Sequence, residues 1–474
     1  MADDLIYLSA LELVRRYRDG EISPVEVAAA VLARIDDVDQ TLNAFRLVDA
    51  ERALDQARES EARWRRGEPK GLIDGVPTSV KDLILTRGWP TLRGSPAIDP
   101  AGPWDQDAPV TARLREHGAV LLGKTTTPEF GWKGVTDSPL TGITRNPWDP
   151  DKTPGGSSGG AAAAAAAGMG ALHVGTDGGG SIRIPAGFTG IFGLKPSFGR
   201  VPAYPLSPFG TLSHVGPMAR TAAEAALMLS VITGPDARDW YALPPEGVDY
   251  VGETETGIAG LKVAFSADLG FARVDPEVAQ LVARAAEQFS ELGAHVEPVD
   301  PGFDDPTPVF DVLWKVGVFN ALKGYSEAER GRMDPGLQQT FDAGRAMPLQ
   351  DYLDAGNWRQ DLGSHMRAFH QRHDLLLTPS LAVPAFDVGV EAPPDRAEAH
   401  DAQGWTRWLS WTPFSYPFNM TQQPACSVPC GFTRAGLPVG LQIVGPMFDD
   451  RLVLRAARAY EAANPIWPTA RPPL

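Results

Sequence analysis

The chain of 474 residues contains only two cysteines, Cys426 and Cys430. Two thiols in a chain of this length do not make a disulfide-rich secreted scaffold, and they make a poor zinc site. No segment reaches the ~18 consecutive apolar residues that a membrane span needs; the alanine run at 161–167 is too short. The first residues, Met-Ala-Asp-Asp, lack the basic and apolar stretches of a signal peptide. We therefore expect a cytoplasmic protein with free thiols and no membrane partner.

Positive charge is also scarce. The chain has 43 Lys and Arg residues against 59 Asp and Glu residues, a formal net charge of −16. Nucleic acids and anionic membranes bind basic patches, so we expect no nucleic-acid partner. Hydrophobic residues make up 43% of the chain and charged residues 22%. This is ordinary globular usage and allows a large buried core.

Signals for helices and strands alternate along most of the chain. Ser9-Ala-Leu-Glu12 and Ser23-Pro-Val-Glu26 both predict helix starts with capping boxes, and we expect helix to continue over 42–66. Strands are predicted over 76–80, 119–122, 171–175, 261–265, 294–299, 374–378 and 440–444, and helices over 110–117, 161–167 and 276–292. The alternation predicts an α/β fold without a linker between independent domains.

Three short segments concentrate lysine, serine and glycine. Lys81 ends a predicted strand, Ser157 lies in Gly-Gly-Ser-Ser-Gly-Gly at 155–160, and Ser181 ends Thr-Asp-Gly-Gly-Gly-Ser at 176–181. Glycine lets the backbone approach a ligand closely and direct its N–H groups toward it. The segments together supply a hydroxyl nucleophile, an amine base and a turn lined with donors, which are the parts that acyl transfer needs.

The expected roles follow from this chemistry. Ser181 is the predicted nucleophile, and Ser157 is predicted to relay a proton between Ser181 and Lys81. Lys81 can act as a base only as a neutral amine, so its pKa must fall by about three units, roughly 4 kcal/mol. The glycines around Ser157 allow an unusual backbone, such as a strained or cis peptide. The backbone N–H groups of the turn predict a nest for an oxyanion: Gly178, Gly179, Gly180 and Ser181.

These motifs resemble the amidase signature family. The likeness also includes Gly-Thr-Asp-Gly-Gly-Gly-Ser-Ile-Arg-Ile-Pro at 175–185, Gly-Leu-Lys-Pro at 193–196 and Gly-Leu-Pro-Val-Gly-Leu-Gln-Ile-Val-Gly at 436–445. The resemblance implies that Lys81, Ser157 as the cis-serine, and Ser181 form the Ser–cisSer–Lys triad of the family. It further implies an oxyanion hole formed by the 178–181 amides, and supporting residues: Ser158, Asp177 and Arg183.

The resemblance also implies a fold, a large mixed β-sheet surrounded by helices in a single domain over 1–474. Within it we expect an N-terminal helical segment at 1–70, a core with the motifs at 71–230, and a remainder at 231–474 whose loops line a substrate pocket.

One position departs from the family. Gly178 stands where many members have a larger residue, so we expect a looser loop or a slightly larger cavity beside the oxyanion.

Other interpretations of the same residues are weaker. The 155–160 run alone is also typical of a flexible linker, but an alanine helix follows it directly. No Gly-Lys-Ser/Thr ends either glycine run, which excludes a phosphate-binding loop. A Ser-His-Asp triad is conceivable with eight histidines, although His173 lies in a predicted buried strand. We expect no metal and no cofactor.

Aromatic residues are the candidates for a substrate pocket. Trp405, Trp408 and Trp411 are spaced to share one side of a helix, where they either pack structurally or form the wall of an apolar acyl or aryl pocket. The predicted pocket residues are Phe130, Trp132, Tyr204, His214, Trp314, Trp405 and Trp408, with Phe209 and Phe319 as weaker candidates.

We therefore expect a serine amidohydrolase that cleaves small apolar or aryl amides through an acyl-enzyme on Ser181. Esters and carbamates are related substrates because they form the same kind of tetrahedral intermediate. Two alternatives stay open: the glutaminase subunit of a tRNA-dependent amidotransferase, and a non-catalytic binding protein on the same fold. The sequence leaves open the substrate, its stereochemistry, the oligomeric state (a homodimer is one option), and whether loops at 301–350 and 385–412 form a lid.

Overall fold

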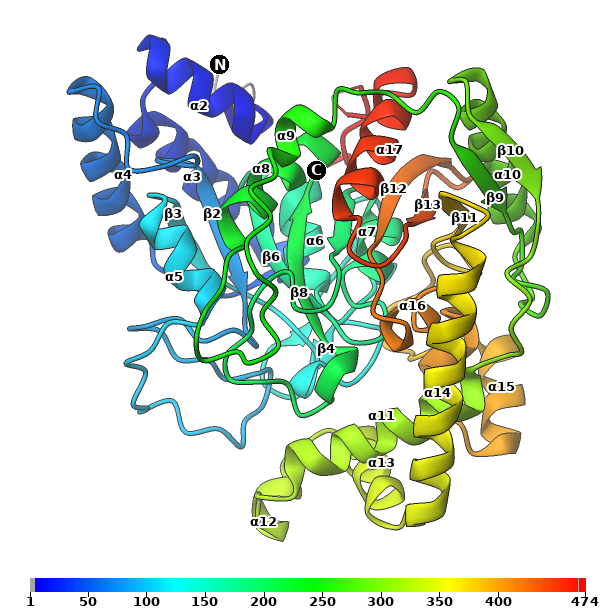
Figure 1. Cartoon of the computed structure of the whole chain (residues 1–474). Coiled ribbons are helices and arrows are strands. Elements are labelled where there is room, and N and C mark those ends of the chain that lie inside the picture. The colour runs from blue at the N-terminus through cyan, green and yellow to red at the C-terminus, as the bar shows by residue number, and fades with distance from the viewer. Residues whose placement is uncertain (1–4, 468) are drawn as a thin grey trace.

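A mixed sheet of 11 strands forms the centre of the computed structural model, which describes residues 5–467 and 469–474 (Figure 1). In spatial order the strands are β1 (Phe45–Val48), β3 (Val120–Thr125), β2 (Pro77–Lys81), β6 (Leu172–Asp177), β8 (His214–Ala219), β7 (Phe192–Lys195), β12 (Ala425–Phe432), β13 (Pro438–Val444), β11 (Leu375–Pro379), β9 (Lys262–Phe265) and β10 (His295–Pro298). Parallel pairs flank a central antiparallel block from β6 to β11, and β1 pairs antiparallel with β3 at one edge. The expected large mixed sheet is confirmed.

Helices cover both faces of this sheet. Helices α6 and α8 both contact β6 and β8, while α7 and α17 both contact β12 and β13. Since α6 packs on α7 and α8 packs on α17, the two pairs lie on opposite faces. The helices are α2 (Ala10–Asp19), α3 (Pro24–Leu42), α4 (Ala50–Arg65), α5 (Pro109–Glu116), α6 (Gly159–Ala166), α7 (Arg183–Thr189), α8 (Ala222–Ile232), α9 (Tyr250–Glu253), α10 (Pro276–Glu291), α11 (Thr307–Leu322), α12 (Glu327–Arg330), α13 (Pro335–Arg345), α14 (Leu349–Phe369), α15 (Pro394–Gln403), α16 (Pro417–Met420) and α17 (Asp450–Ala463).

The alanine-rich helix α6 explains how the motif segments come together. Every residue of α6 is buried, and the helix contacts strands β2, β3, β6 and β8. Side chains no larger than methyl groups let the helix axis lie close to the sheet. The segment that precedes α6 is thereby held against the ends of β2 and β6.

The sequence predictions for individual elements are largely confirmed, including the parallel β9–α10–β10 unit. Ser23 and Glu26 form the predicted capping box, whereas Ser9 caps α2 without the reciprocal bond, because Glu12 binds Arg15 and Arg16 instead. The continuous helix expected over 42–66 is wrong. Asn43 adopts a left-handed conformation that ends α3, and β1 pairs with β3 before α4 begins.

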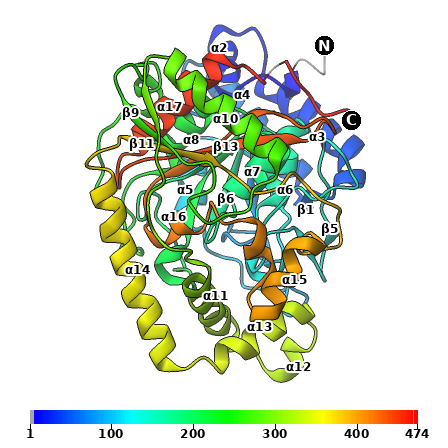
Figure 2. The same cartoon turned by 90° about the vertical axis from the view of Figure 1, so that its right-hand side faces the viewer.

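The segments at 301–350 and 385–412 were expected as loops but are mostly helical. They contain α11, α12, α13, the first residues of α14, α15 and the 3₁₀-helix η3 (Arg407–Trp411). Figures 1 and 2 both show α11 to α14 extending beyond one side of the sheet. Buried apolar side chains such as Phe310, Trp314 and Phe341 join this extension to a hydrophobic cluster that also includes residues of the central sheet. Within the described residues, no helix combines the length and apolarity required to cross a membrane.

Candidate active site

Lys81 is the last residue of β2 and its side chain is completely buried. Its Nζ lies 2.7 Å from Ser157 Oγ, 2.9 Å from Ser158 Oγ and 2.9 Å from Thr176 Oγ1. None of the ion pairs between described residues includes Lys81. Burial lowers the pKa of Lys81 well below its usual value, and the charge of Asp177 only partly opposes this. The amine is therefore surrounded by hydroxyl groups and is held toward its neutral form.

Ser157 is held by a tightly packed backbone. The Gly156–Ser157 peptide bond is cis, and residues 153–160 are all buried. A Cβ on Gly156 would lie 2.6 Å from the backbone of Val135, and one on Gly160 would lie 2.3 Å from Thr126 Oγ1. These glycines are required by close packing, so the segment is not a flexible linker.

Ser181 lies at the start of the turn into α7 and retains an exposed fraction of 7%. Its carbonyl accepts a hydrogen bond from the N–H of Ser158, 3.1 Å away, which ties the two glycine-rich segments together. Within the described residues, no hydrogen bond joins the Ser181 hydroxyl to Ser157 or Lys81. Such contacts often tighten only when a substrate is bound.

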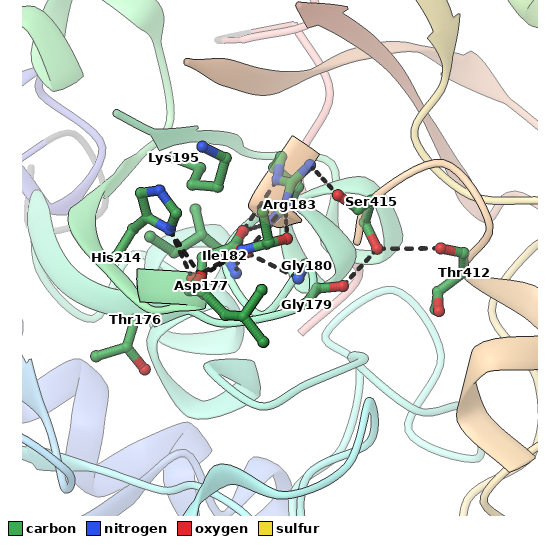
Figure 3. A network of polar contacts seen from close by, with 12 residues as sticks. Thr176, Asp177, Gly179, Gly180, Ile182, Arg183, Lys195, His214, Thr412 and Ser415 are labelled. Atoms are coloured by element: carbon green, nitrogen blue, oxygen red, sulfur yellow. Dashed lines mark hydrogen bonds and ion pairs between the residues drawn. The ribbon is translucent and has the colours of Figure 1, made fainter. Parts of the chain in front are cut away.

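The buried carboxylate of Asp177 shapes the turn that contains Ser181 (Figure 3). Asp177 Oδ1 accepts a hydrogen bond from the N–H of Gly180 at 2.7 Å, and Oδ2 accepts one from Ile182 at 3.2 Å. The same carboxylate forms an ion pair with Arg183 at 2.9 Å. Burial raises the pKa of Asp177, but the Arg183 guanidinium, together with the charge of Lys195 and the hydrogen bond from Asn419, outweighs it and holds the pKa below its usual value.

This geometry changes the predicted oxyanion nest. The Gly180 N–H is already bonded to Asp177 and points away from a ligand. The N–H groups of Gly178, Gly179 and Ser181 take part in none of the hydrogen bonds between described residues. The turn thus offers three unused backbone donors in place of the expected four.

The C-terminal half of the chain holds this turn from the other side (Figure 3). Arg183 donates to Ser415 O and to Gln442 Oε1, both at 2.8 Å, and to Asn419 Oδ1 at 2.6 Å. The Ser415 hydroxyl lies 2.6 Å from the carbonyl oxygen of Gly179. The Ser415 contact fixes the Gly179–Gly180 peptide, which lies between the free N–H groups of Gly179 and Ser181.

Four polar residues of the site were not predicted from the sequence: Thr176, Ser415, Asn419 and Gln442. Thr176 and Gln442 lie inside the motifs at 175–185 and 436–445, and this position could have marked them as site residues. Ser415 and Asn419 lie more than 230 positions from Asp177 and Gly179, and no local pattern in the sequence marks them.

A cavity of about 140 Å³ opens in front of Ser157, Thr176, Gly178 and Ser181. Of the predicted pocket residues, Phe130, Tyr204 and Trp314 line it, as does Phe209. The rings of Phe209 and Trp314 stack with centroids 4.3 Å apart. The cavity therefore combines an aromatic wall with hydroxyl groups and backbone donors.

The other predicted pocket residues do not line this cavity. Trp132 and Trp408 lie behind Trp314: the Trp314 indole N–H donates to Trp132 O at 2.9 Å, and the Trp408 ring lies edge-on to Trp314 at 5.2 Å. Trp405 packs on His400. Correspondingly, η3 buries Trp408 and Trp411 as part of the core.

His214 also lies outside the cavity that contains Ser181. Its Nδ1 donates to the carbonyl of Leu212 at 2.9 Å, and burial lowers its pKa well below the usual value. The residue lines a second cavity together with Phe198 and Tyr241. A neutral histidine bonded to the backbone does not suit a Ser-His-Asp triad.

The space beside Gly178 is filled. A Cβ on Gly178 would lie 3.3 Å from Cζ3 of Trp314, which is tighter than most real contacts. The larger cavity expected at this position is therefore wrong, because the indole occupies the space that a larger residue would need.

Comparisons with known proteins agree with this architecture. A family model described as Amidase matches residues 26–454. An acylamidase of Rhodococcus erythropolis is 37% identical over 473 residues, which cover 99% of this chain and 98% of that protein. A glutamyl-tRNA(Gln) amidotransferase subunit of Myxococcus xanthus (strain DK1622) is 36% identical over 495 residues, covering 98% of this chain and 99% of the other.

Among solved structures, a bacterial aryl acylamidase belonging to the amidase signature enzymes superposes with a TM-score of 0.88. It is 32% identical in sequence, and the match covers 97% of this chain and 96% of the other. Fold, motifs and relatives thus define a hydrolase that acts on amides. The chain belongs to the amidase signature family.

Proposed function

We propose that this protein hydrolyses small amides through an acyl-enzyme on Ser181, with Ser157 and Lys81 moving the protons. The observation that carries the proposal is the buried Lys81 amine, which contacts three hydroxyl groups and no carboxylate. An ordinary buried lysine is stabilised by an ion pair, whereas an amine without one is a usable base near neutral pH.

The hydrogen bonds around Lys81 support transfer of a proton from Ser157 to the lysine amine. The Ser158 hydroxyl donates to the carbonyl of Thr176 at 3.1 Å, so toward Lys81 it can only accept. A neutral amine has two N–H donors and one lone pair. One donor is directed at Ser158. We assign the other to Thr176, which leaves the lone pair for the hydroxyl proton of Ser157.

The reaction then proceeds in two halves. Ser181 Oγ attacks the carbonyl carbon while its proton passes through Ser157 to Lys81, and the N–H groups of Gly178, Gly179 and Ser181 stabilise the oxyanion. The C–N bond breaks as the proton returns through Ser157 to the leaving nitrogen. In the second half, water attacks the ester on Ser181, gives its proton to the same relay, and releases the acid with Ser181 reprotonated.

Apolar or aryl acyl amides are the substrates that we propose, with esters and carbamates as slower or parallel substrates. The aromatic wall of Phe130, Tyr204, Phe209 and Trp314 supports this class, as do the relatives named acylamidase and aryl acylamidase.

The glutaminase alternative fits the cavity less well. Glutamine carries an ammonium group, which needs an acidic partner when it is desolvated. No Asp or Glu lines the described cavity. We therefore favour a single-chain amidase over a glutaminase subunit.

A turnover screen tests this function. Purified protein is incubated with anilides, primary amides, esters, carbamates and glutamine, with the Ser181→Ala variant as the blank. We expect hydrolysis of anilides by the wild type alone. Equal rates in both proteins would reject the proposal, and turnover of glutamine alone would favour the amidotransferase alternative.

A further inference from the structure

The cavity at Ser181 has one charged residue among the residues that line it, Arg93. The residue is half-buried and lies on the stretch between β2 and α5. Its guanidinium takes part in none of the ion pairs or hydrogen bonds that join described residues. An arginine that lines a largely apolar cavity and forms no ion pair with another described residue leaves its positive charge free, which favours an anionic ligand.

The acidic groups close to Arg93 in the fold are already engaged. Asp82 pairs with Arg46 at 3.0 Å and with Lys124 at 3.8 Å. Glu129 accepts hydrogen bonds from the Ser95 hydroxyl and from the N–H of Asp334. Neither carboxylate forms an ion pair with Arg93, so the charge stays available to the cavity.

The backbone holds Arg93 in a fixed position. Its φ is +54°, a conformation that residues with a long side chain rarely adopt. Its N–H donates to the Asp82 carbonyl at 3.0 Å, and its own carbonyl accepts from Phe130 at 2.8 Å. A left-handed residue that is held in this way at a functional cavity is a candidate for a role in that cavity.

We propose that Arg93 binds a carboxylate on the otherwise apolar or aryl substrate, so that the preferred amides carry one anionic group in addition to the scissile bond. The inference rests on the proposed amidase function. The guanidinium fork matches the two oxygens of a carboxylate. A single positive charge matches a monoanion and would leave a dianionic phosphate partly uncompensated. The neutral aromatic walls hold the rest of the substrate.

The test compares carboxylate-bearing anilides with neutral analogues of similar shape. With the carboxylate on the amine side, the pair is 4-acetamidobenzoate and 4-acetamidotoluene. With it on the acyl side, the pair is N-phenylsuccinamate and N-phenylpentanamide. The readout is the ratio of kcat/KM within each pair, measured for the wild type, Arg93→Gln, Arg93→Lys and the control Arg18→Gln. Arg18 is exposed on α2, far along the sequence from every lining residue.

We expect the wild type to favour the carboxylate in at least one pair by about 10- to 100-fold, the range of a charge-assisted hydrogen bond. Arg93→Gln abolishes the preference, Arg93→Lys retains part of it, and Arg18→Gln leaves it unchanged. Calorimetry adds a readout without turnover: in Ser181→Ala the favoured carboxylate binds more tightly than its neutral analogue, and the added Arg93→Gln change removes the difference.

A ratio near one in both pairs, or a preference that survives Arg93→Gln, would overturn the inference. If neutral anilides are still hydrolysed in a Ser181-dependent way, the proposed function stands without it. If Ser181→Ala hydrolyses them as fast as the wild type, the proposed function itself fails.

Discussion

Two glycines of the turn before Ser181 should respond very differently to the same substitution. Gly180 has a φ of +127°, and a Cβ there would lie 2.4 Å from Ser415 Oγ and 2.6 Å from Ser415 Cβ. A Cβ on Gly178 would meet only the edge of Trp314, at 3.3 Å and 3.6 Å. Gly180→Ala must therefore displace the turn or Ser415, while Gly178→Ala needs a shift of a few tenths of an ångström.

The expected loss of kcat in Gly180→Ala can be worked out from how far the turn must shift and from which contacts the shift breaks. To reach an ordinary contact of 3.4 Å, Ser415 Oγ and the new Cβ must separate by about 1 Å. A misplacement of 1 Å can cost about 10²-fold in rate. The displacement also breaks the bond from Ser415 to Gly179 O, which holds the Gly179–Gly180 peptide between the N–H donors of Gly179 and Ser181. Loss of one oxyanion donor costs about 10²–10³-fold, or about 2.7–4 kcal/mol. We expect kcat to fall by that amount in Gly180→Ala and by less than about tenfold in Gly178→Ala.

The assay is the steady-state rate on a neutral anilide, with thermal unfolding as a check that each variant folds. Ser415→Gly removes the two nearest atoms that the new Cβ would meet and leaves Cδ1 of Ile184, at 2.8 Å. Gly180→Ala combined with Ser415→Gly should therefore be less impaired than the two single effects combined. Equal losses in Gly178→Ala and Gly180→Ala, or a Gly180→Ala variant with nearly full activity, would show that these contacts do not control the turn.

The remaining predictions concern charge and packing. Burial lowers the pKa of Lys81, so the amine is neutral above that lowered value. The value of kcat/KM should therefore rise with pH to a plateau that begins well below pH 10. The Lys81→Arg variant cannot deprotonate and should be inactive across this pH range. Arg183→Met leaves the buried Asp177 carboxylate without its ion pair and should lower the free energy of unfolding, measured in urea, by about 3–5 kcal/mol. The control Arg451→Met, which breaks an exposed ion pair, should lower it by less than about 1 kcal/mol. Similar losses in the two variants would contradict the role assigned to Arg183. Gly178→Thr should reduce activity, because the new side chain needs the space that the Trp314 indole occupies. Adding Trp314→Ala to Gly178→Thr should partly restore activity. A double variant no more active than Gly178→Thr would count against this packing.

Local sequence patterns predicted much of the framework. Strand positions followed from short apolar runs, and the end of β2 at Lys81 followed from the residue order. The end of α3 at Asn43 was not predicted. Asn43 adopts a left-handed conformation, but the residues around it favour helix, so the sequence pattern did not indicate a helix end there. The edge strand β1 exists because of its pairing with β3, a tertiary contact that no local pattern records.

The site itself was predictable only in part. Ser157 and Ser181 lie within glycine-rich motifs and Lys81 ends a predicted strand, so their proximity could be inferred. The use of the Gly180 N–H by Asp177 depends on side-chain geometry. The layering of the tryptophans depends on the packing of η3 against α11, which places Trp408 behind Trp314.

Covalent labelling is the sharpest test of Ser181 as a nucleophile activated by Lys81. The protein is treated with a serine-reactive fluorophosphonate, and the modified peptide is identified by mass spectrometry. We expect one label on the peptide that contains Ser181, absent in Ser181→Ala and much slower in Lys81→Ala. A label on another residue, or labelling of Ser181 at an undiminished rate in Lys81→Ala, would be incompatible with this mechanism.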